Sequence, residues 1–328
     1  MRYISLAKAP VRRTFLQWIA AGLLVLPLSA KAAEPLKELR IDWATYNPVS
    51  LVLKDQKLLE KEFEKDGIAI KWVQSAGSNK ALEFLNAGSL DLGSTAGAAA
   101  LIAKINGNPI KSVYVFSRPE WTALVTKSDQ IKTVADLKGK RIAVTRGTDP
   151  HIFLVRTLAG AGLTEKDVKL VLLQHADGRT ALERGDVEAW AGLDPIMASA
   201  EVESGARLFY RKAADNTWGV LNVREEFARD YPDVVKRVLA TYEKARQWSL
   251  ANTKELSKSL IEATKLSDAV IAKQLERTEL THGPIGTAQS DTIIAAGLAL
   301  QEAGVVKADV DIKGVVKALI DPAYLPTR

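Results

Sequence analysis

The chain has 328 residues, of which 47% are hydrophobic and 26% charged, a composition typical of one or two globular domains with their own cores. It contains no cysteine, which excludes disulfides, thiolate metal sites, a cysteine nucleophile and a lipid-anchoring cysteine. The three histidines are scattered and form no H-x-x-x-H pair, so we predict neither a metal site nor a cofactor.

The first 32 residues have the features of a cleaved signal peptide. Basic residues precede an apolar run from Trp18 to Leu28, and Ala30-Lys31-Ala32 supplies an A-x-A cleavage pattern. The run is shorter than a membrane-spanning helix requires. Residues 11–17, VRRTFLQ, resemble the twin-arginine export motif but depart from it at the first and last position. Export by the ordinary secretory route therefore stays open.

Removal of residues 1–32 changes the charge of the protein. The whole chain carries 45 basic and 39 acidic residues, and the signal holds five basic residues and no acidic one. The mature chain would keep 40 basic residues and a net charge of +1, so no basic excess favours nucleic acid as a partner. With no cysteine for a lipid anchor, we expect an exported protein that is free in the periplasm.

After the signal, strand patterns alternate with helix patterns, which predicts an α/β fold. Alternating or continuous apolar residues predict strands at 39–43, 68–72, 90–94, 110–116, 140–145, 169–174, 187–191 and 206–211. Helical spacing predicts helices at 51–63, 79–87 with Ser78 as N-cap, and 98–105, and others that begin near Pro150, Gly178 and Pro195. From Pro232 onward the chain is predicted to be nearly all helical, with later helices at 255–264, 268–279, 291–303 and 312–320.

Two internal similarities favour two lobes of similar structure. Residues 85–92, LNAGSLDL, align without gaps on residues 182–189, LERGDVEA, and each combines a helix end, a glycine stop and a short strand. A second similarity pairs residues 40–48 with residues 141–150, one residue out of register. Together they predict two α/β lobes of about 100 residues each, with the helical C-terminal region added to one of them.

Four loops follow predicted strands and precede predicted helices: 45–48 (TYNP), 93–97 (GSTAG), 146–150 (RGTDP) and 192–195 (GLDP). Three end in Asn-Pro or Asp-Pro, in which proline suits the first helical position and the Asn or Asp side chain caps free amides. Ligands of open α/β sheets bind at such ends, and helix N-termini favour anions. Any one loop alone is equally typical of a plain helix start.

The loop 93–97 matches no catalytic or nucleotide-binding glycine motif. A nucleophile elbow needs G-x-S-x-G, but Thr95 stands at the centre; a P-loop needs a lysine, and a dinucleotide fingerprint needs a different glycine spacing. We predict no catalytic residue here. The alternative of an exported enzyme that uses the same cleft rests on His151 near Thr148 as base and hydroxyl.

Three stretches resemble the substrate-binding proteins of aliphatic-sulfonate ABC importers, a group with nitrate-, taurine- and thiamine-precursor-binding relatives. They are residues 85–103 (LNAGSLDLGSTAGAAALIA), 131–163 (IKTVADLKGKRIAVTRGTDPHIFLVRTLAGAGL) and 183–200 (ERGDVEAWAGLDPIMASA). The resemblance covers nearly all of the mature chain. It implies a type II periplasmic binding fold, in which two α/β lobes surround a cleft.

The implied lobes are joined by crossing strands near 122–127 and 219–223. Lobe one comprises residues 34–122 and 222–328, with the helical C-terminal region packed on it, and lobe two comprises residues 123–221. A sulfonate is a permanent anion, so neutral donors at helix starts suffice to hold it. The resemblance places such donors at Asn47, Gly77, Ser78, Ser94, Thr95 and Gly97 in lobe one, and at Gly147, Thr148 and His151 in lobe two.

Four aromatic residues lie in or beside the cleft segments; they are Tyr46, Trp121, Trp190 and Trp218. Of these, Tyr46, Trp190 and Trp218 are expected to contact the organic part of the ligand. Arg118 is a further candidate for the anion, with a surface position as the alternative. We assign Asp194 to capping the helix at Pro195, and to ligand contact only where the ligand carries an amine.

These observations predict a monomeric periplasmic receptor that captures an alkyl or aryl sulfonate or a sulfate ester and delivers it to an ABC permease in the inner membrane. The same fold binding nitrate, taurine or a thiamine precursor stays open, as does the exported enzyme.

Overall fold

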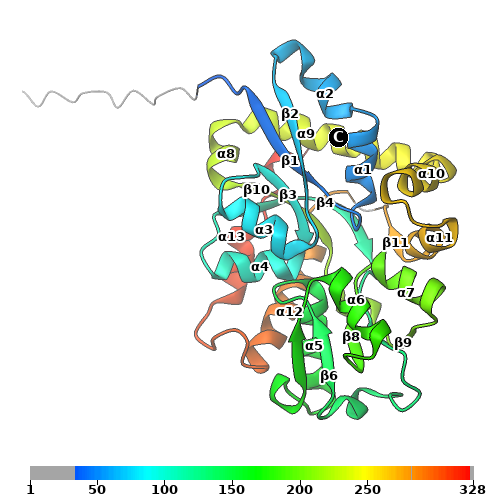
Figure 1. Cartoon of the computed structure of the whole chain (residues 1–328). Helices are drawn as coiled ribbons and strands as arrows, with labels where there is room; N and C mark the ends of the chain where they lie inside the picture. Colours follow the sequence, from blue (N-terminus) through cyan, green and yellow to red (C-terminus); the bar gives the residue numbers. More distant parts are fainter. Residues whose placement is uncertain (1–33, 282, 326–328) are drawn as a thin grey trace, which may run out of the picture. The chain divides into compact units, whose positions relative to one another are not determined.

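The computed structural model describes residues 34–281 and 283–325, and two separate β-sheets organise them (Figure 1). The predicted signal at residues 1–32 lies outside the described residues. We call each sheet with the helices packed on it a lobe. The predicted α/β alternation and two-lobed architecture are confirmed.

The first lobe contains a six-stranded sheet in the order β11-β4-β10-β3-β1-β2. Strands β1, β2 and β3 run parallel, whereas β10 pairs antiparallel with both β3 and β4. The bounds are β1 Glu38–Trp43, β2 Ala69–Gln74, β3 Leu92–Ala96, β4 Ile110–Pro119, β10 Gly219–Arg224 and β11 Thr278–Glu279. A strand from late in the chain thus lies in the middle of the first sheet.

The second lobe contains a five-stranded sheet in the order β7-β6-β8-β5-β9. Its bounds are β5 Leu124–Thr126, β6 Arg141–Val144, β7 Lys169–Leu172, β8 Ala189–Ala191 and β9 Arg207–Tyr210. The chain passes from the first sheet to the second between β4 and β5, and returns between β9 and β10. These two connections link the lobes.

The helices follow the predicted order. In the first lobe they are α1 Pro48–Asp55, α2 Leu58–Phe63, α3 Ser78–Asn86 and α4 Gly97–Ile105, and in the second α5 Asp149–Gly160, α6 His175–Arg184 and α7 Ile196–Ser204. The C-terminal region adds α8 Glu225–Asp230, α9 Pro232–Ala251, α10 Thr253–Thr264, α11 Asp268–Glu276, α12 Thr287–Glu302 and α13 Ile312–Leu319. Short 3-10 helices cover 64–66, 134–137, 165–167, 213–215 and 322–324.

Two local predictions are corrected. The single helix expected at 51–63 is divided into α1 and α2, because Lys57 adopts a left-handed conformation with φ 52°. Ser78 is not the N-cap of α3: Gly77 takes that position, and the Ser78 hydroxyl instead accepts a hydrogen bond from the Ala96 amide at 3.0 Å. The hydroxyl therefore ties the start of α3 to the end of β3.

The C-terminal helices pack on the first lobe as expected, and they also reach the second. Helices α9 and α10 contact α1, and α12 and α13 contact α4. In addition, α11 contacts α7 and α12 contacts α5. A Cβ atom at Gly97 would lie 2.6 Å from Ile293 Cδ1 of α12, so any larger residue at this close approach would require the Ile293 side chain to move.

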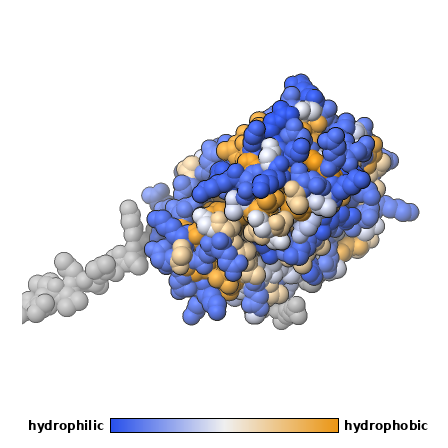
Figure 2. Space-filling model, turned by 90° about the horizontal axis from the view of Figure 1, so that it is seen from below, coloured by the Kyte–Doolittle hydropathy of each residue, from blue (hydrophilic) through white to orange (hydrophobic). Residues whose placement is uncertain are grey.

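Among the described residues, no helix combines the length and the apolar character that crossing a bilayer requires. Figure 2 shows one face of the protein, on which hydrophilic side chains surround smaller hydrophobic areas. The exposed large hydrophobic residues come from different elements; they are Leu172, Val202, Leu250, Leu298 and Val305. Single exposed apolar residues of this kind are ordinary on a globular surface.

Candidate functional site

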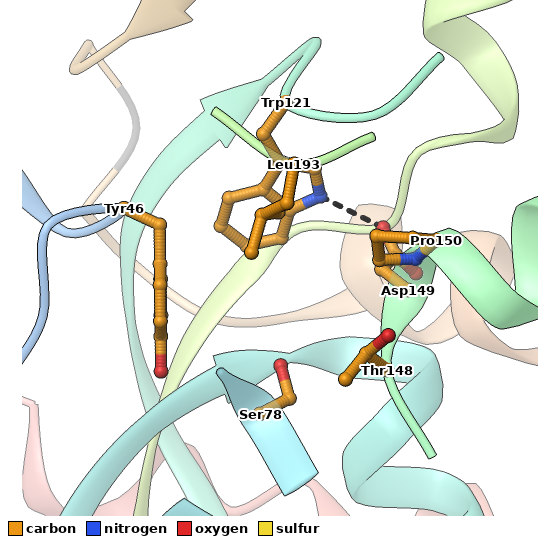
Figure 3. Close-up of a pocket in the computed structure, with 7 residues that line it drawn as sticks. All are labelled: Tyr46, Ser78, Trp121, Thr148, Asp149, Pro150 and Leu193. Carbon is orange, nitrogen blue, oxygen red and sulfur yellow. Dashed lines mark hydrogen bonds between the residues drawn. The ribbon is translucent and has the colours of Figure 1, made fainter. Parts of the chain in front are cut away.

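A small cavity, with room for about one water molecule, lies between the two lobes (Figure 3). Its lining residues are Tyr46 and Ser78 from the first lobe, Thr148, Asp149, Pro150 and Leu193 from the second, and Trp121 from the connection between β4 and β5. All of them except Trp121 lie within three residues of a helix start. The N-termini of α1, α3, α5 and α7 therefore converge on one place, as the sequence predicted for three of the four loops.

The aromatic wall of the cavity is held by hydrogen bonds to the protein itself. The Tyr46 hydroxyl donates to the Ser94 carbonyl at 2.9 Å, and its ring meets the Trp121 ring edge-on, with centroids 6.1 Å apart. Trp121 Nε1 donates to Asp149 Oδ2 at 2.8 Å, the bond drawn in Figure 3. Both rings are thus fixed with an apolar surface toward the cavity.

The two aliphatic hydroxyls of the lining differ in their free hydrogen-bonding capacity. Thr148 Oγ1 donates its proton to the Thr145 carbonyl at 2.6 Å. Ser78 Oγ accepts from the Ala96 amide, and the described residues offer its own proton no acceptor. Because a hydroxyl carries one proton and two lone pairs, Ser78 keeps a donor for a bound anion.

Asp149 is buried at the edge of the cavity, but its carboxylate faces protein donors. Oδ1 accepts from Thr217 Oγ1 at 2.7 Å, and Oδ2 accepts from the Thr217 amide at 3.0 Å as well as from Trp121. Burial raises the pKa of the Asp149 carboxyl, and these donors oppose the shift. The predicted capping role of this residue is wrong: Thr148 is the N-cap of α5, and Asp149 joins α5 to both connections between the lobes.

The loop 93–97 lies behind the cavity wall and contributes no lining residue. Ser94 Oγ donates to the buried carboxylate of Asp42, at 2.9 Å from Oδ2, and burial raises the pKa of Asp42 to about 7. Thr95 Oγ1 accepts from Asn222 Nδ2 at 2.8 Å. The Gly97 amide donates to the Trp218 carbonyl at 2.9 Å. The polar groups of this loop are therefore engaged by the protein.

Two of the predicted aromatic contacts lie away from the cavity. Trp190 is fully buried in the second lobe, where a Cβ atom on Gly178 would come within 2.7 Å of its Nε1. Trp218 Nε1 donates to Thr292 Oγ1 at 3.3 Å, and the guanidinium of the exposed Arg118 lies 5.2 Å from the Trp218 ring centroid. Neither ring is part of the cavity lining.

The remaining predicted residues surround the cavity without lining it. Asn47 is the N-cap of α1, where its side chain accepts from the Ser50 amide at 3.2 Å. Gly77 and Gly147 immediately precede Ser78 and Thr148, and Gly147 has a φ of +77° that favours glycine.

His151 and Asp194 have partners in the protein. His151 Nε2 lies 2.8 Å from Glu165 Oε1, and burial lowers the pKa of this imidazole. Asp194 Oδ1 accepts from the Ala198 amide at 2.9 Å, in the first turn of α7, as predicted for a cap, and from Arg277 Nη2 at 2.8 Å.

Four lining residues were not on the predicted list of ligand contacts; they are Trp121, Asp149, Pro150 and Leu193. The last three lie inside the predicted loops, so the loop pattern in the sequence could have identified them as lining residues. Trp121 was noted only for its position beside a cleft segment. Within the described ranges, no group of three or more His, Asp or Glu residues gathers as a metal site.

Comparison with known proteins identifies the family. Residues 62–256 match the NMT1/THI5-like family. A relative from Escherichia coli (strain K12), named for binding aliphatic sulfonates, is 33% identical over 273 residues, which cover 80% of this chain and 83% of the relative. The chain belongs to the NMT1/THI5-like family.

Solved structures confirm the fold of this NMT1/THI5-like protein. The alkanesulfonate-binding protein from Xanthomonas axonopodis pv. citri bound to MOPS is 28% identical, with a TM-score of 0.79 over 88% of this chain and 99% of that one. The periplasmic aliphatic sulphonate binding protein from Escherichia coli is also 28% identical, with a TM-score of 0.74 over 89% of this chain and 94% of that one. The resemblance inferred from the sequence is therefore confirmed.

Proposed function

We propose that this protein is a periplasmic solute-binding protein that captures an organosulfonate or a sulfate ester for an ABC importer. The observation that carries the proposal is the convergence of four helix starts from two lobes on one cavity. The names of the similar proteins support the class of ligand.

The chemistry of the cavity suits a permanent anion. The first amides of a helix have no acceptor within the helix, and each favourable contact of an anion with a helix N-terminus contributes about 0.3–1 kcal/mol near the surface. Ser78 adds a hydroxyl donor. A sulfonate stays ionised at every physiological pH, so it needs no titrating partner.

The lining of the cavity contains two kinds of group, polar ones and apolar ones. In our proposal the Ser78 hydroxyl and the backbone at Gly77, Gly147 and Thr148 hold the sulfonate oxygens. Tyr46, Trp121 and Leu193 contact the organic part.

The other residues predicted from the sequence do not contact the ligand in this proposal, and most of them hold the cavity loops in position. Asn47, Ser94, Thr95 and Gly97 hold the loops of the first lobe, and His151 and Asp194 hold those of the second. Arg118, Trp190 and Trp218 have no direct contact with the ligand in this proposal.

The proposal extends to location and partner. After cleavage of residues 1–32 the monomeric protein would be free in the periplasm and would deliver its ligand to an ABC permease in the inner membrane. In our proposal it binds without turnover: His151, the histidine nearest Thr148 in sequence, is paired with Glu165, and the Thr148 hydroxyl donates to the Thr145 carbonyl.

Titration calorimetry in a phosphate buffer free of sulfonates tests the function. Methanesulfonate, hexanesulfonate, benzenesulfonate and p-nitrophenyl sulfate are compared with nitrate, which probes the alternative small-anion ligand. We expect at least one sulfur oxyanion to bind and nitrate to bind more weakly. Absence of binding to every sulfur oxyanion contradicts the proposal, and release of p-nitrophenol would instead indicate an enzyme.

A further inference from the structure

A second polar feature, His175, lies at the boundary between the lobes beside the cavity. It is the first residue of α6 and is 1% exposed. Its Nδ1 lies 3.2 Å from Thr145 Oγ1, whereas Nε2 is buried and has no hydrogen-bond partner among the described residues. A buried polar atom without a partner is uncommon, and it points to a missing one.

The internal repeat of the sequence gives this position a second significance. Residues 85–92 align without gaps on residues 182–189, and seven residues earlier in the same register Ser78 corresponds to His175. The two residues begin α3 and α6, respectively. His175 is therefore the counterpart, in the second lobe, of the cavity residue that keeps a free donor.

The neighbouring threonine determines which nitrogen of His175 carries the proton. Thr145 Oγ1 donates to the Leu173 carbonyl at 2.7 Å, which uses its only proton. At the contact with His175 the threonine oxygen must accept, so the proton is on Nδ1. Burial lowers the pKa of this imidazole to about 3, which keeps it neutral. Nε2 then presents a lone pair.

That lone pair faces the opposite lobe. The position that a Cβ atom on Gly77 would occupy lies 3.0 Å from His175 Nε2 and 2.9 Å from Asn79 Oδ1. Asn79 Oδ1 is also buried and without a partner among the described residues. Two acceptors, one from each lobe, thus lie against Gly77, next to Ser78, and neither has a hydrogen-bond partner among the described residues.

We propose that His175 is a specificity-determining residue, which accepts a hydrogen bond from a hydroxyl or amine on the organic part of the ligand, with Asn79 as a second acceptor. Sulfonate oxygens are acceptors only and cannot satisfy these atoms. A plain alkyl chain would leave both unpaired, and sites built to bind a donor discriminate strongly against analogues that lack it. This inference rests on the proposed function and deepens it.

Calorimetry with matched ligands tests the inference. Propanesulfonate is compared with 2-hydroxyethanesulfonate and 2-aminoethanesulfonate, which have the same number of heavy atoms in the chain, and methanesulfonate reports on the head group alone. We expect the wild type to bind at least one of the two donor-bearing ligands about tenfold or more tightly than propanesulfonate. Preference for one of them identifies the hydroxyl or the amine as the donor.

Variants separate a role in specificity from a role in folding. His175→Phe should remove the preference and change the affinity for methanesulfonate little, whereas His175→Gln, which keeps an acceptor near the position of Nε2, should retain part of it. Nitrogen-15 spectra of histidine-labelled wild type should show the proton on Nδ1 of His175. This measurement uses only the wild type, so it does not depend on whether the variants fold.

The outcomes distinguish the inference from the function on which it rests. Binding of methanesulfonate with equal wild-type affinities for the three longer ligands overturns the inference and leaves the function intact. A proton on Nε2, or a preference that survives in His175→Phe, overturns it as well. Failure of every sulfonate, methanesulfonate included, overturns the proposed function itself.

Discussion

The starts of α4 and α5 are built from similar sequences but meet different surroundings. A glycine and a hydroxyl residue precede each of them closely, within β3 before α4 and after β6 before α5. At α4 the amides of Gly97 and Ala98 donate to the Trp218 carbonyl and to Thr217 Oγ1. At α5 the first residues line the cavity instead.

The comparison teaches that a helix start can face a cavity only where no other segment supplies acceptors for its first amides. The segment that covers α4 leads into β10, which returns from the second lobe and lies beside β3. Thr217 also donates to Asp149. The same residue therefore accepts from the Ala98 amide at the start of α4 and holds the first residue of α5 in place. Four predictions, ordered by size, test this difference.

The largest expected effect is that of Ser78→Ala on ligand affinity. A hydrogen bond to a charged group contributes about 1.5–3 kcal/mol, so loss of the free donor should weaken binding of methanesulfonate at least tenfold. Calorimetry measures the affinity. Because Ser78→Ala also removes the hydrogen bond to the Ala96 amide, the midpoint of urea unfolding measures the accompanying loss of stability. A change of less than about threefold would show that the α3 start does not hold the anion.

Gly97→Ala should destabilise the fold without altering binding. The new Cβ would lie 2.6 Å from Ile293 Cδ1, and overpacking of this kind costs about 1–3 kcal/mol. Urea unfolding measures the loss, and a second substitution, Ile293→Ala, should be less costly in this background than in the wild type. Equal costs in the two backgrounds would contradict the close contact.

Thr95→Val is the matched control for Ser78→Ala in the covered loop. It removes the acceptor of Asn222 Nδ2, which keeps a bond to the Gly93 carbonyl at 3.3 Å, so we expect a loss of about 1 kcal/mol in stability. Affinity for methanesulfonate should stay unchanged. Weaker binding by this variant would return the loop 93–97 to the binding site.

The smallest effect concerns the pH dependence of stability near neutrality. The folded pKa of His175 is lowered to about 3, so the unfolded chain takes up this proton first and the free energy of unfolding falls as the pH drops below about 6.5. Between pH 7.5 and 6 the contribution is less than about 1 kcal/mol. His175→Phe should show a correspondingly shallower dependence, and identical slopes would contradict a buried neutral imidazole.

Much of the fold could be predicted from local patterns. Apolar patterns located all the strands except β5, β10 and β11; the first two were expected only from the family resemblance, and β11 has only two residues and therefore too short a pattern. The break at Lys57 was missed because a left-handed lysine has no sequence signature.

The site was harder to predict because its residues belong to separate segments. The loops that contain Tyr46, Thr148 and Leu193 were recognised as helix starts, and they line the cavity. His151 was chosen as a donor, but it lies against Glu165, whereas His175 reaches the lobe boundary. Helix position alone could not distinguish the two histidines, although the internal repeat aligns His175 with Ser78.

The sequence by itself determined the α/β alternation, the two related lobes and the positions of the helix starts, because these follow from periodicity, glycine and proline within a few neighbouring residues. Only the tertiary structure decided which helix starts face the cavity. The starts of α4 and α5 have similar local sequences, but the partners of their amides and hydroxyls are distant in sequence. Strand β10 pairs with β3, directly before α4, and has no such place before α5.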